Sequence, residues 1–560
     1  MRAKARAPMG NWDATDEGIF SLGLSLFSVD EPASMRWIIR MTHDPLSTSQ
    51  LRTPFSFVAT CLGVRNCLLA LLVAAALTST SRADIRLPAL FTDHMVLQQN
   101  ARVPVWGWAD DGERVTVEVR NQKVATIAKG GKWSVNLLNL KAGGPYELKI
   151  SGKNTITVQD VLVGEVWVAS GQSNMEWPMR ASFEPKADIA GSANPMIRLF
   201  TVPKLKADEP RSDVKASWQL CGPESVTNFS AVAYYFGRDL QSARGVPVGI
   251  IHTSWGGSPA EVWMSRGVLD ANPGYKKSIL ESHDTAMNNY QTALVKFETE
   301  QAELKSQGKT SDQKPPGKPF WKPTELYNGM IAPLLPYAIK GAIWYQGESN
   351  ADRAAQYRRL LPAMITDWRQ RFGVGEFPFY IVQLAAWQAT YPQPRENNWA
   401  ELREAQTLTA KNLPNCGLAL AIDIGDAADI HPKNKREVGR RLALAALAQA
   451  YGKKVEASGP WYHSMKIDGS KIRLKFDHAG GGLMAKSGKL TGFAIAGADH
   501  KFVWADAVVD GQTVVVSSPE IVKPVAVRYA WDINPVCNLY NQAGLPAVPF
   551  RTDSSANKEK

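Results

Sequence analysis

Four short stretches of the sequence carry the residue types that acyl transfer needs. They read GQSNMEW (171–177), TSWGGSPAEVW (253–263), YQGESN (345–350) and DIGDAADIHP (423–432). Any one of them could be an ordinary strand-to-helix turn, because Gly, Ser and Asn suit such turns and N-caps. Together they supply a serine, glycine amides, side-chain amides and an acid–histidine pair. This set predicts a nucleophile, a base, a group that orients the base, and donors for an oxyanion.

Ser173 is the candidate nucleophile and His431 the candidate general base. Ser173 follows an apolar run, and its N–H near a helix start can donate to an oxyanion. His431 precedes Pro432, which suits the first turn of a helix. The α/β-hydrolase elbow is not predicted, because its second glycine is replaced by Met175. Only His252 competes with His431, and its place inside an apolar strand is typical of a core histidine.

The acidic run offers a second chemistry, which is metal binding. Asp423, Asp426 and Asp429 lie with His431 within nine residues, and carboxylates suit Mg²⁺ or Ca²⁺. Calcium loops, however, place ligands at alternating positions with a glycine at the bend, and this run lacks that pattern. We therefore predict neither a metal nor another cofactor.

Apolar strands alternate with helical segments through the middle of the chain, and each polar block follows one of four strands. Alternation of this kind predicts a parallel sheet with helices on both faces, whose ligands bind beyond the carboxyl ends of the strands. The four blocks should therefore meet at one edge. The expected strands are 165–170, 247–254, 341–347, 378–385 and 418–425, and the expected helices are 231–243, 354–372 and 435–452.

All-β patterns flank this catalytic region on both sides. Residues 84–160 alternate with a period of two between turn signals and predict a small β-sandwich, and 454–553 predict a second β unit. The catalytic domain then spans 161–453. A polar helix and a Lys/Pro-rich loop at about 278–323 interrupt it, and we expect a surface insertion there, with a lid over the site as the alternative.

Residues 1–83 are predicted to be a non-structural extension followed by a secretory signal at about 60–83. The apolar run CLLALLVAAALT is too short for a permanent membrane span and is followed by small residues up to Ala83, the expected cleavage site. Translation from Met35 or Met41 would place this signal near the N-terminus. We expect a secreted or periplasmic protein with no integral membrane segment after signal removal.

Composition narrows the classes of partner. The net charge is +11, but the basic residues are spread along the chain, so a solvated surface is favoured and nucleic-acid binding is set aside. Hydrophobic residues make up 44% of the 560 residues, which is enough for a buried core. The three cysteines after residue 83 allow at most one disulfide, so packing must stabilise the fold. The oligomeric state stays open.

The four blocks resemble those of the SGNH hydrolase superfamily and, within it, the sialate O-acetylesterase family, whose nucleophile block reads G-Q-S-N-M. The similarity extends through GPWYHSMKI, FDHAGGGL, GFAIAGAD and NPVCNLYN, and so covers nearly all of the chain after residue 84. The resemblance implies a three-layer α/β/α domain flanked by two β units. It also implies that Ser173 is the nucleophile and His431 the base.

The same resemblance implies an oxyanion hole built from three donors. They are the amide of Ser173, a glycine of the second block and a side-chain amide of the third. The glycine is Gly256 or Gly257, and we assign the donor to Gly257. The sequence reads G-E-S-N where family members commonly have G-x-N-D, so Gln346 or Asn350 must serve, and Gln346 is closer to the strand end. Gln346→Ala should then slow turnover far more than it alters folding.

The acid that orients the base departs most from the family pattern. D-x-x-H is usual, but Ala428 stands three residues before the histidine. Asp429 and Asp426 remain nearby, and we assign the role to Asp429. A Ser–His dyad stays open, as does orientation by a backbone carbonyl or by Glu348.

Aromatic residues near the blocks suit sugar rings. The predicted substrate-binding set is Trp177, Trp255, Glu348 and Trp387. With the resemblance, this predicts a secreted carbohydrate O-acetylesterase, like the sialate O-acetylesterases, with an acetylated glycan as its partner. The alternatives are a xylan-type polysaccharide acetylesterase of the same fold and a secreted carbohydrate-binding protein without catalysis.

Overall fold

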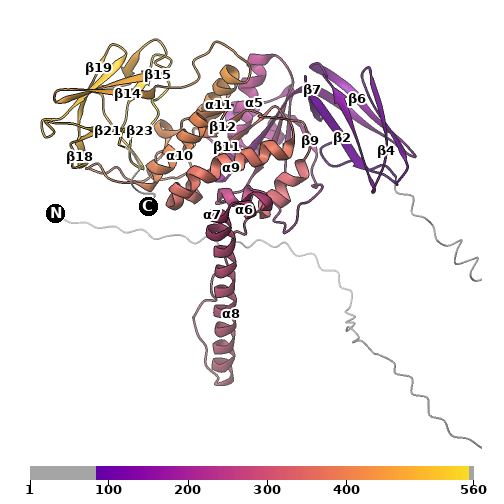
Figure 1. Ribbon diagram of the computed structural model, residues 1–560. Coiled ribbons are helices and arrows are strands. Elements are labelled where there is room, and N and C mark those ends of the chain that lie inside the picture. The colour runs from indigo at the N-terminus through magenta and orange to yellow at the C-terminus, as the bar shows by residue number, and fades with distance from the viewer. Residues whose placement is uncertain (1–83, 554–560) are drawn as a thin grey trace, which may run out of the picture. The chain divides into compact units, whose positions relative to one another are not determined.

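The computed structural model describes residues 84–553, so the predicted extension and signal at 1–83 lie outside the described residues. A mixed sheet with the order β13–β12–β11–β7–β10–β8–β9 forms its centre (Figure 1). Neighbouring strands are parallel except for the edge pair β8–β9, which is antiparallel. The strands are β7 (Thr155–Gly171), β8 (Asn194–Thr201), β9 (Trp218–Cys221), β10 (Val248–Ser254), β11 (Gly341–Tyr345), β12 (Phe379–Val382) and β13 (Cys416–Ala419).

Helices cover both faces of this sheet, as predicted. On β7, Val166 and Val168 join the hydrophobic cluster that includes α9 (Ala354–Phe372) and α10 (Asn398–Asn412). Trp167 and Ala169 join the cluster of α5 (Ala231–Arg244) and α11 (Lys435–Gln449). The two-residue alternation of a strand thus divides its side chains between two helical layers, which confirms the α/β/α architecture.

Local signals set the ends of these helices. Ser230 Oγ accepts the Ala233 N–H at the start of α5, and Asn434 Oδ1 accepts the Glu437 N–H at the start of α11. Helix α10 was not among the expected helices. Its buried face includes Arg403 and Gln406, which carry polar heads and so obscure the apolar period. Shorter helices are α3 (Pro185–Ala190), α4 (Pro223–Thr227), α6 (Arg266–Ala271) and α7 (Pro273–Tyr275).

The predicted boundary between residues 160 and 161 lies inside a continuous strand. The first half of β7 pairs with β6 and β1, and its second half pairs with β10 and β11, so one strand serves both the N-terminal unit and the central sheet. A separate pair, β2–β5, shares the core of the N-terminal unit. These strands are β1 (Val96–Gln98), β2 (Arg102–Trp108), β3 (Arg114–Val119), β4 (Gln122–Ile127), β5 (Lys132–Leu138) and β6 (Gly143–Ser151).

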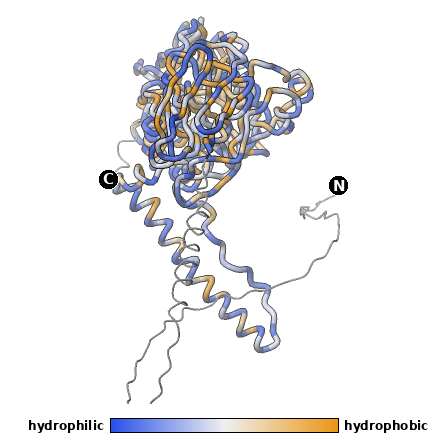
Figure 2. The backbone as a smooth tube through the Cα atoms, turned by 90° about the vertical axis from the view of Figure 1, so that its right-hand side faces the viewer, coloured by the Kyte–Doolittle hydropathy of each residue, from blue (hydrophilic) through white to orange (hydrophobic). Residues whose placement is uncertain are grey.

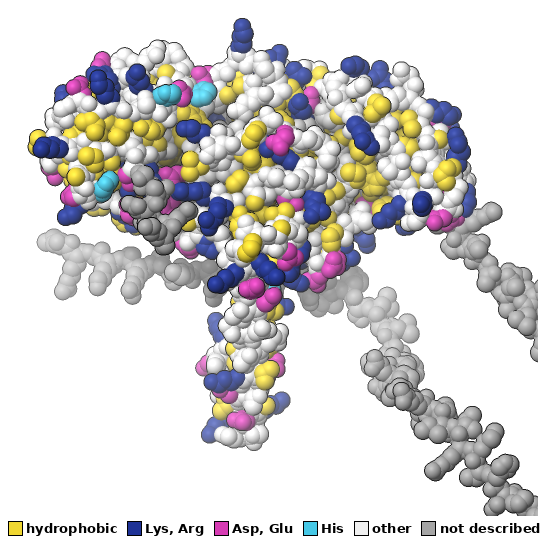
Figure 3. Space-filling model, viewed as in Figure 1, with side chains coloured by type: hydrophobic (Ala, Val, Ile, Leu, Met, Phe, Trp, Pro, Cys, Tyr) yellow, Lys and Arg dark blue, Asp and Glu magenta, His cyan; other side chains and the backbone are white. Residues whose placement is uncertain are grey.

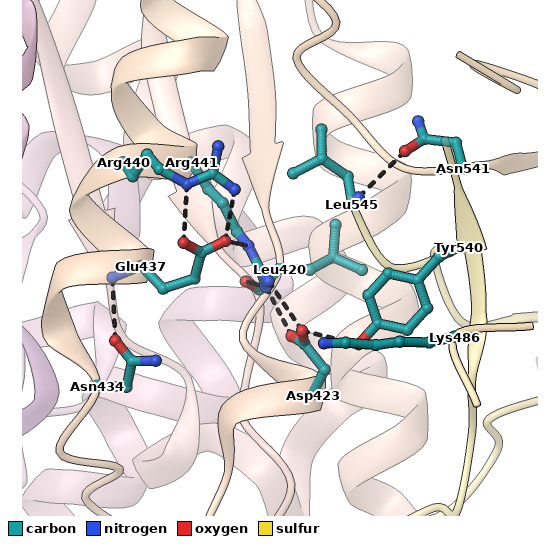
Figure 4. A network of polar contacts seen from close by, with 10 residues as sticks. All are labelled: Leu420, Asp423, Asn434, Glu437, Arg440, Arg441, Lys486, Tyr540, Asn541 and Leu545. Carbon is teal, nitrogen blue, oxygen red and sulfur yellow. Dashed lines mark hydrogen bonds and ion pairs between the residues drawn. The ribbon is translucent and has the colours of Figure 1, made fainter. Parts of the chain in front are cut away.

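The C-terminal β unit packs on the catalytic domain through a buried polar network (Figure 4). Arg441 of α11 donates to both carboxylate oxygens of Asp423, at 2.6 and 2.8 Å, and the Tyr540 hydroxyl donates to Asp423 at 2.9 Å. The strands of this unit are β14 (Trp461–Asp468), β15 (Lys471–Asp477), β16 (Leu483–Ala485), β17 (Phe493–Ala496), β18 (Phe502–Trp504), β19 (Asp506–Asp510), β20 (Thr513–Ser517), β21 (Ala526–Tyr529), β22 (Leu539–Asn541) and β23 (Phe550–Arg551). The thiols Cys221, Cys416 and Cys537 are all free.

The insertion consists of the helix α8 (Ser282–Ser306) and a segment, 307–323, that returns to the catalytic domain. Helix α8 extends away from the sheet (Figure 1) and has no buried residue. Hydrophilic residues predominate along it (Figure 2), and charged side chains of both signs are scattered over its visible face (Figure 3). Within residues 84–553, no helix is long and apolar enough to cross a membrane.

Candidate active site

Ser173 lies just beyond the carboxyl end of the central strand β7. It is the first residue of the four-residue helix α2 (Ser173–Glu176), directly after β7. Gly171 has φ +142°, and a Cβ on it would lie 2.1 Å from the Tyr345 carbonyl oxygen of β11, so only glycine fits this close approach. The Gln172 side chain accepts the Gly347 and Ser349 N–H groups at 3.4 and 3.3 Å, which ties the first block to the third.

The structure brings Ser173 and His431 together, although 258 residues separate them. Ser173 Oγ is 2.9 Å from His431 Nε2, which is hydrogen-bonding distance for a nucleophile and its base. His431 lies in the loop between β13 and α11. Its imidazole stacks on the Trp177 ring, with centroids 5.0 Å apart and planes at 20°.

Asp429 is the carboxylate that faces the base. Its Oδ1 accepts the backbone N–H of His431 at 2.9 Å and lies 3.2 Å from ring Nδ1, so the loop bends enough for a carboxylate two residues away to reach the ring. Asp426 instead accepts the Ala428 N–H at 2.9 Å, and Asp423 is held by Arg441 in the network of Figure 4. The expected strand 418–425 ends at Ala419, so Asp423 lies in a 3₁₀ turn beyond it. The three carboxylates of the acidic run therefore turn to different partners.

Burial keeps the base neutral. It lowers the pKa of His431 below its ordinary value, the Asp429 charge opposes this, and the Lys435 charge lowers the pKa further. Lys435 is itself fully buried, and burial lowers its pKa to about 7. A neutral imidazole is the form that can accept the Ser173 proton.

A buried polar network lies behind the nucleophile and includes Glu348. Asn174 Nδ2 donates to Glu348 Oε1 at 2.7 Å and to the Ile430 carbonyl at 3.1 Å, while its Oδ1 accepts from Lys435 Nζ. Burial raises the pKa of Glu348, and Oε2 of this residue has no partner among the described residues. Glu348 was predicted to bind substrate, but it does not line the pocket around Ser173, and its carboxylate accepts from Asn174. It is linked to the His431 loop through Asn174, which also donates to the Ile430 carbonyl.

The oxyanion donors differ from the predicted set at the glycine. The N–H of Ser173 is at a helix start, where it has no intrahelical acceptor. A Cβ on Gly256 would lie 3.3 Å from Ser173 Cβ, whereas one on Gly257 would meet nothing within 4 Å. Gly256 therefore replaces Gly257 beside the nucleophile. Its N–H donates to Glu176 Oε2 at 2.7 Å, an acceptor that a substrate oxygen would have to displace.

The side-chain amides of Gln346 and Asn350, in the third block, donate to other buried protein groups. Gln346 Nε2 donates to Asn350 Oδ1 at 2.7 Å and to the Ser258 carbonyl at 3.2 Å, and its Oε1 accepts from the Tyr357 hydroxyl. Asn350 Nδ2 donates to Glu261 at 3.0 Å. Both amides are buried. In this structure the amide donors of Gln346 and Asn350 join the loops behind the site, and that one of them completes the oxyanion hole stays a prediction.

A pocket of about 340 Å³ surrounds Ser173 and His431. Trp177 and Trp255 line it as predicted from their positions, but Trp387 does not, because its ring packs on Trp399 at 5.5 Å. Sequence reasoning missed Glu176 and Lys204, which line the pocket and contact each other at 2.6 Å. Glu176 lies in the first block, three residues after Ser173, and this position is a sequence signal for it. Nothing in the sequence around Lys204 points to the site.

His252, the rival base, lies in the core of β10. It is 7% exposed, its Nε2 is 2.6 Å from Ser254 Oγ, and burial lowers its pKa to about 4. This second serine–histidine contact lines no part of the pocket around Ser173. It provides a natural control for the first.

Comparison with known proteins places the chain among carbohydrate esterases. Residues 316–448 match the family described as carbohydrate esterase, sialic acid-specific acetylesterase. The chain is 30% identical over 537 residues to the sialate O-acetylesterase of Rattus norvegicus, covering 86% of this chain and 97% of that protein. It is 29% identical to the Homo sapiens sialate O-acetylesterase, covering 83% and 92%. The solved structure of a novel carbohydrate acetylesterase from Xanthomonas citri is similar with a TM-score of 0.73 and 38% identity, covering 84% of this chain and 100% of that one.

Proposed function

This chain belongs to the sialate O-acetylesterase family and is a carbohydrate acetylesterase, and we propose that Ser173 and His431 perform its hydrolysis. The observation that carries the proposal is the 2.9 Å contact between Ser173 Oγ and His431 Nε2 in a pocket open to solvent. Asp429 faces Nδ1 of the same ring and holds the tautomer that presents a bare Nε2 to the serine.

In the first half-reaction Ser173 Oγ attacks the carbonyl carbon of the acetyl ester as His431 Nε2 takes its proton. The N–H of Ser173 donates to the oxyanion, and Gly256 supplies a second N–H once Glu176 releases it. The tetrahedral intermediate collapses, the C–O bond to the sugar breaks, and the imidazolium returns the proton to the sugar oxygen. The deacetylated sugar leaves and Ser173 carries the acetyl group.

In the second half-reaction water replaces the sugar. His431 takes a proton from a water molecule as the water oxygen attacks the acetyl carbonyl carbon. The bond from that carbon to Ser173 Oγ then breaks, and His431 returns the proton to Ser173 Oγ. Acetate leaves and the free enzyme is restored. Trp177 stacks on the imidazole in the resting site and limits its rotation between these steps.

We propose O-acetylated sialate as the acetylated sugar. Two relatives carry that substrate in their names, and Lys204 supplies a cation at the pocket rim for a sugar carboxylate. Acetylated neutral polysaccharide is the second candidate, favoured by the Trp177 and Trp255 rings and by the pairing of Lys204 with Glu176. Comparing kcat/KM for O-acetylated sialic acid and for acetylated xylo-oligosaccharides decides between them; a higher value for the neutral substrate would reject sialate.

The nucleophile is tested with a chromogenic acetate ester. Ser173→Ala should lower turnover by about 10³-fold or more while leaving the melting temperature unchanged, because loss of the nucleophile removes the covalent route. Ser254→Ala is the matched control, because it removes the other serine in contact with a histidine. Equal activity in wild type and Ser173→Ala would overturn the assignment. Glycan binding with no hydrolysis by wild type would favour the non-catalytic alternative.

We further propose that the protein is exported and cleaved after Ala83. The support is the apolar run and small-residue boundary in 60–83, which lie outside the described residues. N-terminal sequencing of the mature protein from the cell envelope or medium tests this. A mature chain that begins well before residue 84 would reject it.

A further inference from the structure

The returning segment of the insertion ends in two aromatic residues beside the active-site pocket. The Trp321 ring meets the Trp255 ring edge to face at 5.7 Å, and Phe320 meets Trp321 in the same manner at 4.7 Å. Because Trp255 lines the pocket of Ser173, these three rings form a continuous aromatic path from that pocket to the base of α8.

Lys206 fixes this path in place. Its ammonium lies 3.8 Å from the centroid of Phe320, 4.4 Å from that of Trp321 and 5.9 Å from that of Trp255. It also pairs with Glu325 at 3.0 Å and donates to the Phe320 carbonyl. The charge of Lys206 is therefore balanced by a carboxylate, and its contacts with the rings brace them.

The path leads into a second hollow of about 670 Å³. Its lining residues come from the insertion, from the residues just after it and from 206–208, and they include Lys206, Asp208, His283, Lys318 and Phe320. Phe320 is its aromatic wall and is 65% exposed, although a side chain of this size is stabilised by burial. A hollow of this volume, with an exposed ring and several polar groups, has the form of a binding site for a small polar ligand.

We infer that this hollow is a subsite for the sugar adjacent to the acetylated sugar, with the insertion as its outer wall. The inference rests on the proposed function, because the occupant is the continuation of the glycan held at Ser173. A pyranose ring has an apolar face that can stack on an aromatic ring and hydroxyls that can bond to Lys318, His283 and Asp208. The three lysines and three carboxylates that line the hollow balance in charge, which favours a neutral ring here. The insertion thus selects oligosaccharides over single acetylated sugars.

Binding to the inactive Ser173→Ala protein tests the subsite independently of catalysis. Calorimetry compares O-acetylated sialyllactose with O-acetylated sialic acid, and acetylated xylo-oligosaccharides with acetylated xylose. We expect the oligosaccharide of at least one pair to bind more tightly than its monosaccharide. Adding Phe320→Ala should weaken that oligosaccharide about tenfold, as loss of one stacking ring does for other ligands, and leave the monosaccharide unchanged.

The control is Val295→Ala. Val295 is an apolar side chain of α8 that is 61% exposed, like Phe320, but it does not line the hollow. In otherwise wild-type enzyme, Phe320→Ala should raise KM for the oligosaccharide with kcat unchanged and leave turnover of 4-nitrophenyl acetate intact. Equal binding of each oligosaccharide and its monosaccharide, or no effect of Phe320→Ala, overturns the subsite. Absence of hydrolysis by wild type would reject the proposed function alone, because the binding comparison does not depend on turnover.

Discussion

Asp429 and His431 are only two residues apart, yet Oδ1 of the first lies 3.2 Å from ring Nδ1 of the second. The same oxygen accepts the His431 backbone N–H, so one carboxylate shapes the loop and faces the base. Asp429 is 35% exposed on its side chain, which makes this a weaker orienting contact than a buried triad acid provides.

Asp429→Asn should therefore lower turnover by only about tenfold, because a contact this exposed contributes on the order of 1 kcal/mol. The Asp429 charge raises the pKa of His431, so its loss should move the acidic limb of the kcat/KM profile to lower pH. Asp426→Asn is the control, since Asp426 accepts the Ala428 N–H and does not contact the ring. Identical pH profiles for the two variants would show that Asp429 does not orient the base.

Lys435→Met should move the same limb in the opposite direction. The Lys435 charge lowers the pKa of His431, so removing that charge raises the pKa. The acidic limb of the kcat/KM profile should therefore move to higher pH. Lys435 has a pKa of about 7 and is mostly charged on the acidic side, where the limb lies. The matched control is Lys433→Met, which removes an exposed lysine two residues before Lys435, in the loop that precedes α11. A shift shared by both variants, or to lower pH for Lys435→Met, contradicts the prediction.

Gln346→Ala should lower stability more than catalysis, contrary to the expectation from sequence. The substitution leaves buried partners on Asn350, Ser258 and Tyr357 without their hydrogen bonds. Unfolding free energy should fall by about 2–4 kcal/mol, as expected for several unsatisfied buried groups. Urea unfolding measures this, with the exposed Gln313→Ala as control. A hundredfold loss of kcat with unchanged stability would restore Gln346 to the oxyanion hole.

The two glycines of the second block should respond differently to alanine. At Gly256 an added Cβ would lie 3.3 Å from Ser173 Cβ, so Gly256→Ala should displace the nucleophile and lower kcat by tenfold or more, on the order expected for a misplaced catalytic group. At Gly257, with φ +73°, the added Cβ has space but the backbone is strained. Gly257→Ala should cost about 1 kcal/mol of stability and leave kcat near wild type. The reverse pattern would place Gly257 beside the reacting atoms.

The sequence predicts those residues of the site whose roles depend on their immediate neighbours in the chain. Local sequence patterns indicate the strand before Ser173, the turn at Gly171 and the helix after His431. They do so because the backbone conformation at each place requires particular residue types nearby. Strand–helix alternation then places the four blocks at one edge of a sheet. Helix α10 was missed because its buried Arg403 donates to four backbone carbonyls, a role that a hydropathy pattern does not show.

The sequence by itself determined the α/β/α architecture, the family, and the pair Ser173 and His431. Tertiary structure decided which polar groups at the strand ends are free to react. Gln346, Asn350 and Glu348 are of suitable chemical type, but the side-chain amides of Gln346 and Asn350 donate to buried partners and Glu348 accepts from Asn174. Lys204 comes to the pocket from a segment outside the four blocks, and Trp321 of the insertion packs on Trp255 of the pocket wall. Spacing cannot encode such contacts, because they exist only after the sheet and the returning segment have packed.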